Sequence, residues 1–337
     1  MPSTNADRPC PACLGDSRTD VLTVRENMFG LREEFDYSVC ADCGSVALIS
    51  IPEDMATYYP RNYYSVDLDP EQALGAPVVR QFAQLVIGSA LWGRGVLSGT
   101  ATALIPRRQL RTLVSVLGSI RRAGLVNGKE TRVLDVGCGS GILVFALGLG
   151  GVRNVVGVDP FMSGGRNLST GGQLRHQDLS EVEGSYDLIM FHHSLEHVPD
   201  PESSLREALT RLRPGGSVLV RMPTPSSHAF EQYGPAWVSL DAPRHFVVLS
   251  REGLKTLCAR LGASVRSVVD DSTGFQFWGS EQYLSGIPLM DSRSVMVKPR
   301  HSSFSRARRR GWERQAVALN RAGRGDQAAW VITPDRT

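Results

Sequence analysis

The sequence of 337 residues lacks the long hydrophobic segments of membrane and exported proteins. It contains no 18 uninterrupted apolar residues, which argues against a membrane-spanning helix. No apolar segment follows a basic start, which argues against a secretory signal. The most apolar stretch, residues 78–105, is broken by polar residues. We expect it to form a helical pair that packs on the domain, with a helix on a membrane surface as the alternative. These absences predict a cytoplasmic protein.

Lysine is almost absent from the chain. Only Lys129, Lys255 and Lys298 occur, so arginine supplies nearly all of the positive charge, and the formal net charge is only +3. This near-neutral balance makes a nucleic-acid partner a poor expectation. Arginine binds phosphate and carboxylate through paired hydrogen bonds, but base composition also produces an arginine excess. Three roles stay open for the basic segment 297–314: binding of an acidic substrate, binding of a membrane surface, or formation of a solvated helix.

Four of the six cysteines form two C-x-x-C pairs near the N-terminus, CPAC and CADC. Two such turns can supply the four thiolates of a tetrahedral zinc site, so we predict Cys10, Cys13, Cys40 and Cys43 as zinc ligands. Free thiols, a redox pair and disulfides are the alternatives, although thioredoxin-like chemistry needs a single C-x-x-C in a βαβ unit. A site with four protein ligands has no open position and should stabilise rather than catalyse.

From residue 131 onward, short apolar strands alternate with segments suited to helices. The strand candidates are RVLDVG, VVGVD, QLRHQD, YDLIMFHH and SVLVRMP, followed later by ASVRSVVDD and QAAWVIT. Apolar strands separated by helices predict a parallel sheet covered on both faces. We expect an α/β chain with a zinc-binding module at 1–60 and a helical linker or cap at 61–128. The main domain would occupy 129–337, with an insertion at 272–322.

The strongest motif is RVLDVGCGSGILV, in which a strand ends near Asp135 and glycines follow at alternate positions, Gly137, Gly139 and Gly141. Glycine permits backbone angles and close approaches that a Cβ would block. The helix that begins directly after the loop offers free N–H groups, so the loop suits a nucleotide-like ligand over the strand tips. A dinucleotide loop would need its third glycine one residue later, and a Walker loop would need a Lys–Ser/Thr pair; both are missing.

This loop resembles motif I of the class I S-adenosylmethionine-dependent methyltransferases, and the resemblance continues over roughly residues 131–271. It implies a Rossmann-like, doubly wound sheet that is mostly parallel with an antiparallel last strand. It also implies S-adenosylmethionine as the cofactor. One departure is visible: FMSGGRNLSTGG is short and rich in glycine where the family usually has a full second helix.

The resemblance also assigns the cofactor-binding residues. Asp135 would lie near the methionine end of the cofactor, and the three glycines would line its path. Asp159, after the second strand, would accept hydrogen bonds from both ribose hydroxyls. Asp178, in HQDL, would lie near the adenine amine.

The cysteine pairs, the tyrosines between residues 58 and 64, the cofactor domain and the segment DAPRH together resemble a bacterial subgroup of these enzymes. In that subgroup a small, zinc-ribbon-like N-terminal module precedes the methyltransferase domain. Its members tailor sugars, glycans and other secondary metabolites. The resemblance implies a small-molecule or glycan-linked acceptor, with a phosphate-bearing acceptor as one option. We expect the tyrosines to pack between the modules, with closure of an acceptor pocket as the alternative.

The segment FHHSLEH places polar groups at the carboxyl end of the domain's fourth strand, where open α/β sheets bind ligands. We take His193, Glu196, His197 and His245 as candidates for a catalytic base or a substrate-orienting group. A structural role and a metal site are the alternatives. In the ubiquinone-pathway O-methyltransferases the corresponding stretch reads E-x-x-E-H and is associated with a divalent cation. Here an imidazole replaces one carboxylate, which weakens the case for a hard cation.

The segment WVSLDAPRH supplies His245 and a nearby cation, Arg244. Arg244 is a candidate for binding a phosphate or carboxylate of the substrate. The alternative is an ion pair with Asp241 that stabilises the loop.

Three functions compete for this sequence. The leading hypothesis is a methyltransferase that carries out O- or C-methylation of a small-molecule or glycan-linked acceptor. An RNA methyltransferase is the second, although the fourth-strand segment lacks the [ND]-P-P-[YF] signature of many base N-methyltransferases. A non-catalytic adaptor with a zinc module is the third, and the intact glycine loop argues against it. The sequence does not fix the oligomeric state.

Overall fold

The computed structural model of the chain describes residues 9–16, 18–60, 69–73, 77–93, 113, 116–121, 123–300 and 303–335. Tyr63, Tyr64 and most of residues 94–115 of the predicted helical linker lie outside the described residues. The chain forms two compact units. Unit 1 comprises Met1–Tyr59, Leu195–Ser204 and Arg221–Trp330, and unit 2 comprises Pro60–Ser194, Leu205–Val220 and Val331–Thr337. The linear boundaries expected at residues 60 and 128 stay a prediction.

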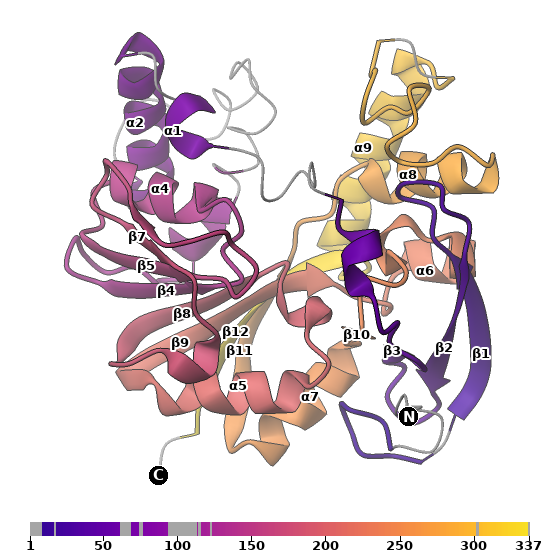
Figure 1. The fold of residues 1–337 in the computed structure, drawn as a ribbon, viewed down its shortest axis with the longest axis horizontal. Coiled ribbons are helices and arrows are strands. Elements are labelled where there is room, and N and C mark those ends of the chain that lie inside the picture. Colours follow the sequence, from indigo (N-terminus) through magenta and orange to yellow (C-terminus); the bar gives the residue numbers. More distant parts are fainter. Residues whose placement is uncertain are drawn as a thin grey trace. The chain divides into compact units, whose positions relative to one another are not determined.

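Eight strands form the main sheet, in the order β11-β12-β9-β8-β4-β5-β7-β6 (Figure 1). Their bounds are β4 (Arg132–Val136), β5 (Asn154–Val158), β6 (Arg166–Asn167), β7 (Gln173–Arg175), β8 (Tyr186–His192), β9 (Leu212–Pro223), β11 (Ala263–Asp270) and β12 (Gln327–Pro334). β4 pairs in parallel with β5 and β8, and β5 pairs in parallel with β7. The predicted Rossmann-like, mostly parallel sheet is confirmed. The division between the two units falls within β9 and β12, and the antiparallel direction of the last strand stays a prediction.

The core of unit 2 follows from the apolar strands. Val133 and Leu134 of β4 and Leu188 and Ile189 of β8 are fully buried, as strands covered on both faces require. Helix α4 (Ile142–Leu149) follows β4 and buries six side chains, so it is apolar on nearly every side. Helices α1 (Pro70–Ala73) and α2 (Pro77–Trp92) pack against α4. The three helices lie together over the β4, β5 and β7 side of the sheet (Figure 1).

The segment between β5 and β7 has no full helix. Residues 159–172 form turns and the two-residue strand β6, which pairs antiparallel with β7. Glycine costs about 1 kcal/mol relative to alanine inside a helix, and this segment carries four glycines. The departure noted in the sequence is therefore present in the fold.

Unit 1 contains a second sheet, of four strands in the order β1-β2-β3-β10 (Figure 1). Its strands are β1 (Arg18–Arg25), β2 (Glu34–Cys40), β3 (Val46–Leu48) and β10 (Val247–Val248). β1 contains the apolar, β-branched run VLTV, and β2 contains EFDYSV. β10 comes from the segment after DAPRH, about 200 residues later in the chain, and pairs antiparallel with β3. The N-terminal module is therefore completed by a strand from the C-terminal half of the chain.

Unit 1 also contains helices. They include α6 (His228–Tyr233), α7 (Arg251–Arg260), α8 (Phe275–Leu284) and α9 (Arg306–Arg321), and α5 (Pro201–Thr210) begins in this unit. The predicted insertion 272–322 holds α8 and α9. The basic run begins α9, which buries Trp312 and Ala316 and exposes most of its arginines, as a solvated helix does. Within the described residues, no helix combines the length and apolarity that crossing a membrane requires.

Candidate functional site

The glycine loop between β4 and α4 has the left-handed backbone that its sequence predicts. Gly137, Gly139 and Gly141 have φ values of 72°, 52° and 78°. Residues with a Cβ rarely adopt such angles, so glycine is required at each position. Gly137 also lies against Ser194, where an added Cβ would come within 2.4 Å of the serine Cβ. Ser194 in turn donates a 2.6 Å hydrogen bond to the carbonyl oxygen of Val136. The loop is thus packed against the turn that follows β8.

Asp135 lies directly below this loop in β4. Its side chain is buried, and its Oδ1 atom has no hydrogen-bond partner among the described residues. Burial, together with the nearby Asp159 carboxylate, raises the pKa of Asp135 to about 7. A buried carboxylate that lacks a partner is costly. This one has the charge and position to receive a cationic ligand at the loop.

Asp159 follows β5 and is tied to the same loop. Its carboxylate accepts hydrogen bonds from the backbone N–H groups of Gly139 (2.9 Å) and Phe161 (2.8 Å). A carboxylate has about four acceptor positions, so two remain for a ligand such as a ribose diol. Asp178 lies further along, where its Oδ1 caps the short helix Leu179–Glu181 by accepting from the backbone N–H and the hydroxyl of Ser180. These hydrogen bonds lower the pKa of Asp178 and keep it ionised.

The residues of this edge fit S-adenosylmethionine. An orphaned buried carboxylate at Asp135 suits a group with positive charge, and the glycine backbone permits close approach of a ligand. The second carboxylate, Asp159, suits a pair of hydroxyls. All six predicted cofactor residues lie in unit 2, Asp135 in β4 and the other five in the loops after β4, β5 and β7.

His193 directly follows β8, the fourth strand of the domain, in a strained conformation. Its φ is 55°, in the left-handed region that non-glycine residues seldom occupy. The ring is half-buried and meets the ring of His192 edge to face, with centroids 5.1 Å apart. Ser194, held by Val136, follows directly. Strain of this kind costs about 1–3 kcal/mol and is concentrated at functional sites.

Glu196, His197 and His245 form a cluster within unit 1. One ligand atom from each lies within 4.8 Å of the others, and the imidazole centroids of His197 and His245 are 4.7 Å apart. Burial and the neighbouring His197 lower the pKa of His245 to about 4, so this ring is neutral at pH 7. The structure thus brings together three of the four predicted catalytic residues. The fourth, His193, belongs to unit 2.

Hydrogen bonds determine which ring nitrogens carry protons. Nδ1 of His245 lies 2.9 Å from the carbonyl oxygen of Ser239, and Nδ1 of His197 lies 2.9 Å from that of Arg244. A carbonyl oxygen only accepts, so each Nδ1 is the donor. The Nε2 atom of the neutral His245 ring is then the acceptor. Tyr59 adds a hydroxyl 3.2 Å from Nδ1 of His197.

Arg244 is bound by protein carboxylates. Its guanidinium is fully buried and donates to Asp241 at 2.6 and 3.0 Å and to Glu26 at 2.9 Å. It also donates to the carbonyl oxygen of Tyr58 at 3.2 Å. These contacts support the loop-stabilising alternative and leave little reason to assign Arg244 to a substrate phosphate.

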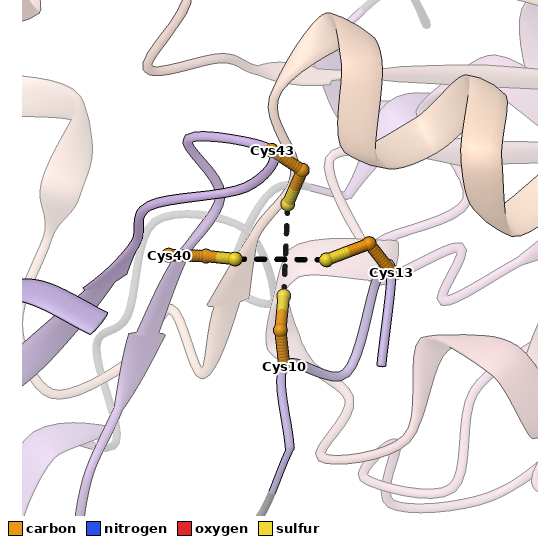
Figure 2. Close-up of side chains that lie close together, drawn as sticks. All are labelled: Cys10, Cys13, Cys40 and Cys43. Atoms are coloured by element: carbon orange, nitrogen blue, oxygen red, sulfur yellow. Dashed lines mark hydrogen bonds between the residues drawn. The ribbon is translucent and has the colours of Figure 1, made fainter. Parts of the chain in front are cut away.

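The four N-terminal cysteines point toward a common centre, which Figure 2 shows in close-up. The sulfur atoms of Cys10 and Cys43 are 3.6 Å apart, as are those of Cys13 and Cys40. This exceeds a disulfide bond of about 2.05 Å and approaches the roughly 3.8 Å between sulfurs around a tetrahedral zinc with Zn–S bonds of about 2.3 Å. A hydrogen bond from Cys10 lowers the pKa of Cys43 to about 5, so Cys43 favours its thiolate form, whereas burial raises the pKa of Cys13 to about 11.

The two cysteine turns have the same backbone geometry. In each, the N–H of the first cysteine donates to the carbonyl oxygen five residues later, from Cys10 to Gly15 and from Cys40 to Ser45, both at 2.9 Å. The residue after each pair is left-handed, Leu14 at φ 62° and Gly44 at φ 74°. Two matching turns therefore present the four sulfurs from opposite sides.

Comparisons with known proteins identify the domain. The family model described as a methyltransferase domain matches residues 107–268. A ubiquinone biosynthesis O-methyltransferase from Aeromonas salmonicida is 36% identical over 29% of this chain and 45% of its own length. The enzyme of the same name from Chromobacterium violaceum is 37% identical over 31% and 48%. The chain thus spans about half the length of the curated relatives it matches.

Solved structures show the same kind of likeness. A SAM-dependent methyltransferase from Archaeoglobus fulgidus aligns with 65% of this chain and 93% of its own, at 21% identity and a TM-score of 0.38. The family match identifies residues 107–268 as a methyltransferase domain.

Several residues of the site were not anticipated from the sequence. Ser194 locks the glycine loop, and only its position beside the histidines hinted at a role. Glu26 is fully buried, pairs with Arg244 and accepts from the backbone N–H groups of Phe29, Gly30 and Leu31. The residues on either side of Glu26, Arg25 and Asn27, do not distinguish this buried glutamate from an exposed one.

Proposed function

We propose that the protein transfers a methyl group from S-adenosylmethionine to a hydroxyl group of a small-molecule or glycan-linked acceptor. The observation that carries this proposal is the orphaned, buried carboxylate of Asp135 beneath three left-handed glycines. The relatives named as O-methyltransferases favour oxygen over carbon as the methylated atom.

The chain's own residues would divide the work between binding and proton transfer. Asp135 and the glycine backbone would hold the methionine end of the cofactor, and Asp159 the ribose. The bound cofactor would supply an electrophilic methyl group. Much of the rate enhancement of such an in-line displacement comes from holding nucleophile and methyl in line.

A hydroxyl nucleophile also has to lose its proton. We assign this role to His193, which follows β8 at the carboxyl edge of the sheet in unit 2. His245, with a pKa of about 4, is a poorer proton acceptor near pH 7. We instead assign the His197–His245 pair to hydrogen bonding, since an imidazole that carries its single proton on Nδ1 offers Nε2 as an acceptor to a hydroxyl-bearing ligand.

A pair of isosteric variants tests the cofactor assignment. Asp159→Asn should weaken binding of S-adenosylhomocysteine by about tenfold or more, since hydrogen bonds to a charged group are worth about 1.5–3 kcal/mol. Asp187→Asn is the control, because Asp187 accepts from Arg132 N–H at 2.8 Å and pairs with Arg213 in the same unit. Equal affinities in calorimetry would remove the assignment of Asp159.

We also propose that Cys10, Cys13, Cys40 and Cys43 bind one structural zinc ion. The 3.6 Å sulfur separations and the two matching turns support a tetrahedral site. Four protein ligands leave no position for a substrate, so the ion would act through folding.

A further inference from the structure

The segment that carries His245 is anchored by the N-terminal strands. Val247 pairs with Ala47 and Val248 with Val46 in the β3–β10 ladder. The N–H of Leu48 donates to the carbonyl oxygen of Phe246 at 2.8 Å. The backbone directly after His245 is therefore part of the N-terminal sheet.

His245 itself and the residue before it have further contacts with the same module. Tyr37 of β2 is fully buried and donates a 2.9 Å hydrogen bond from its hydroxyl to the carbonyl oxygen of His245. Arg244 is paired with Glu26, in the turn that follows β1. The carbonyl oxygen of Arg244 receives the Nδ1–H of His197. The Glu26–Arg244 ion pair thus fixes the residue whose carbonyl oxygen orients His197.

The far end of the segment is tied to the cysteine turns. Ser250 donates its hydroxyl to the carbonyl oxygen of Cys43, and its N–H donates to the hydroxyl of Ser45 at 3.0 Å. The Cys43 sulfur lies 3.3 Å from that same Ser45 hydroxyl. The segment from residue 244 to residue 250 is therefore held at both ends by residues 26–48.

We infer that the N-terminal module is a positioning frame for the His197–His245 pair, and that an intact cysteine cluster keeps both rings in the Nδ1–H form with Nε2 as acceptor. Tyr37 and Arg244 are the positioning residues. This inference rests on the proposed function for its catalytic meaning, but its structural content can be measured without an acceptor.

The imidazole tautomers report the effect directly. Long-range ¹H–¹⁵N NMR of full-length, histidine-labelled protein loaded with zinc should show His245 and His197 protonated at Nδ1. Tyr37→Phe keeps the buried ring and the zinc ligands but removes the donor to the His245 carbonyl. It should shift His245 out of the fixed Nδ1–H form and speed amide exchange at residues 244–248. Cys10→Ser, with its zinc content measured, should do the same for both histidines.

Matched controls separate positioning from general destabilisation. Thr23→Val lies in the same module, where its hydroxyl donates to Asp36 on the exposed face, and it should leave both tautomers unchanged. Binding of S-adenosylhomocysteine, whose predicted residues all lie in unit 2, should stay within about twofold in all three variants. Fixed Nδ1–H tautomers in both Tyr37→Phe and zinc-free Cys10→Ser would overturn the inference. If the unaltered protein did not bind S-adenosylhomocysteine, the proposed function would be overturned instead.

Discussion

Gly137 packs directly against Ser194 at the carboxyl edge of the sheet: a Cβ on the glycine would lie 2.4 Å from the Cβ of the serine. The glycine also has a φ of 72°. The cofactor loop and the turn carrying the proposed base are therefore fitted to each other, because Ser194 is the neighbour of His193.

Gly137→Ala should separate these two elements. We expect a loss of stability of about 1–3 kcal/mol from backbone strain and contact, together with a clear loss of affinity for S-adenosylhomocysteine. Gly124→Ala is the matched control, since Gly124 has a φ of 66° but nothing within 4 Å of an added Cβ. Calorimetry and chemical denaturation of both variants measure the difference. Equal losses would mean that the contact with Ser194 is unimportant.

Asp135 predicts a stability that depends on pH. Its pKa is about 7 in the folded protein, above the ordinary value of 3.8. The folded state therefore binds this proton more tightly than the unfolded chain, and the free energy of unfolding should fall as pH rises from about 4 to about 7. Asp135→Asn removes this penalty, so the variant should be more stable than the unaltered protein at pH 8, by up to about 4 kcal/mol, and similar at pH 4.

The same carboxylate should control cofactor binding. A cationic ligand favours the ionised form of Asp135, so the affinity for S-adenosylmethionine should rise as pH increases through about 7. The Asp135→Asn variant should not show this rise. Calorimetry at several pH values measures both effects. An Asp135→Asn variant that binds as tightly as the unaltered protein at pH 8 would contradict the role of this residue.

The buried Arg244 predicts a large cost on substitution. Arg244→Met leaves the carboxylates of Glu26 and Asp241 without their cation, which should lower the free energy of unfolding by about 3–5 kcal/mol. Arg25→Met removes an exposed pair with Glu34 and should cost less than about 1 kcal/mol. Urea denaturation compares the two. If Arg244→Met proved as mild as its control, the ion pairs around residue 244 would not be structural.

The cysteine cluster predicts a bound metal. Purified protein should contain one zinc ion per chain by elemental analysis, and Cys13→Ser should lose it. Removal of the ion by a chelator should lower the melting temperature, because metal binding at such a site is coupled to folding. Cys258→Ser serves as control, since this buried cysteine lies on α7 and has no place in the cluster. Metal-free protein with an unchanged melting temperature would remove the structural role.

The backbone of the glycine loop could be predicted because its signals are local. The strand–loop–helix pattern specifies a tight turn, and the left-handed backbone of this turn requires glycine at positions 137, 139 and 141. The apolar runs of β4 and β8 likewise indicate buried strands without knowledge of their partners. The missing second helix was visible in the glycines of residues 159–172 for the same reason.

The environment of His245 could not be predicted, because it depends on contacts across the length of the chain. Glu26 and Arg244 are separated by 218 residues, and Tyr37 reaches the carbonyl of His245 across 208. The two-residue strand β10 pairs with β3 by backbone hydrogen bonds that leave no pattern in its own sequence. For the same reason the sequence left Arg244 open between a substrate phosphate or carboxylate and an ion pair with Asp241, and only the fold shows Glu26 beside it.

Isothermal titration of S-adenosylhomocysteine into the full-length protein tests the central claim most directly. We predict saturable binding to one site per chain, weakened in Asp159→Asn and retained in Asp187→Asn. A flat titration with folded, zinc-loaded protein would contradict the cofactor pocket at Asp135 and Asp159, and with it the methyl-transfer function.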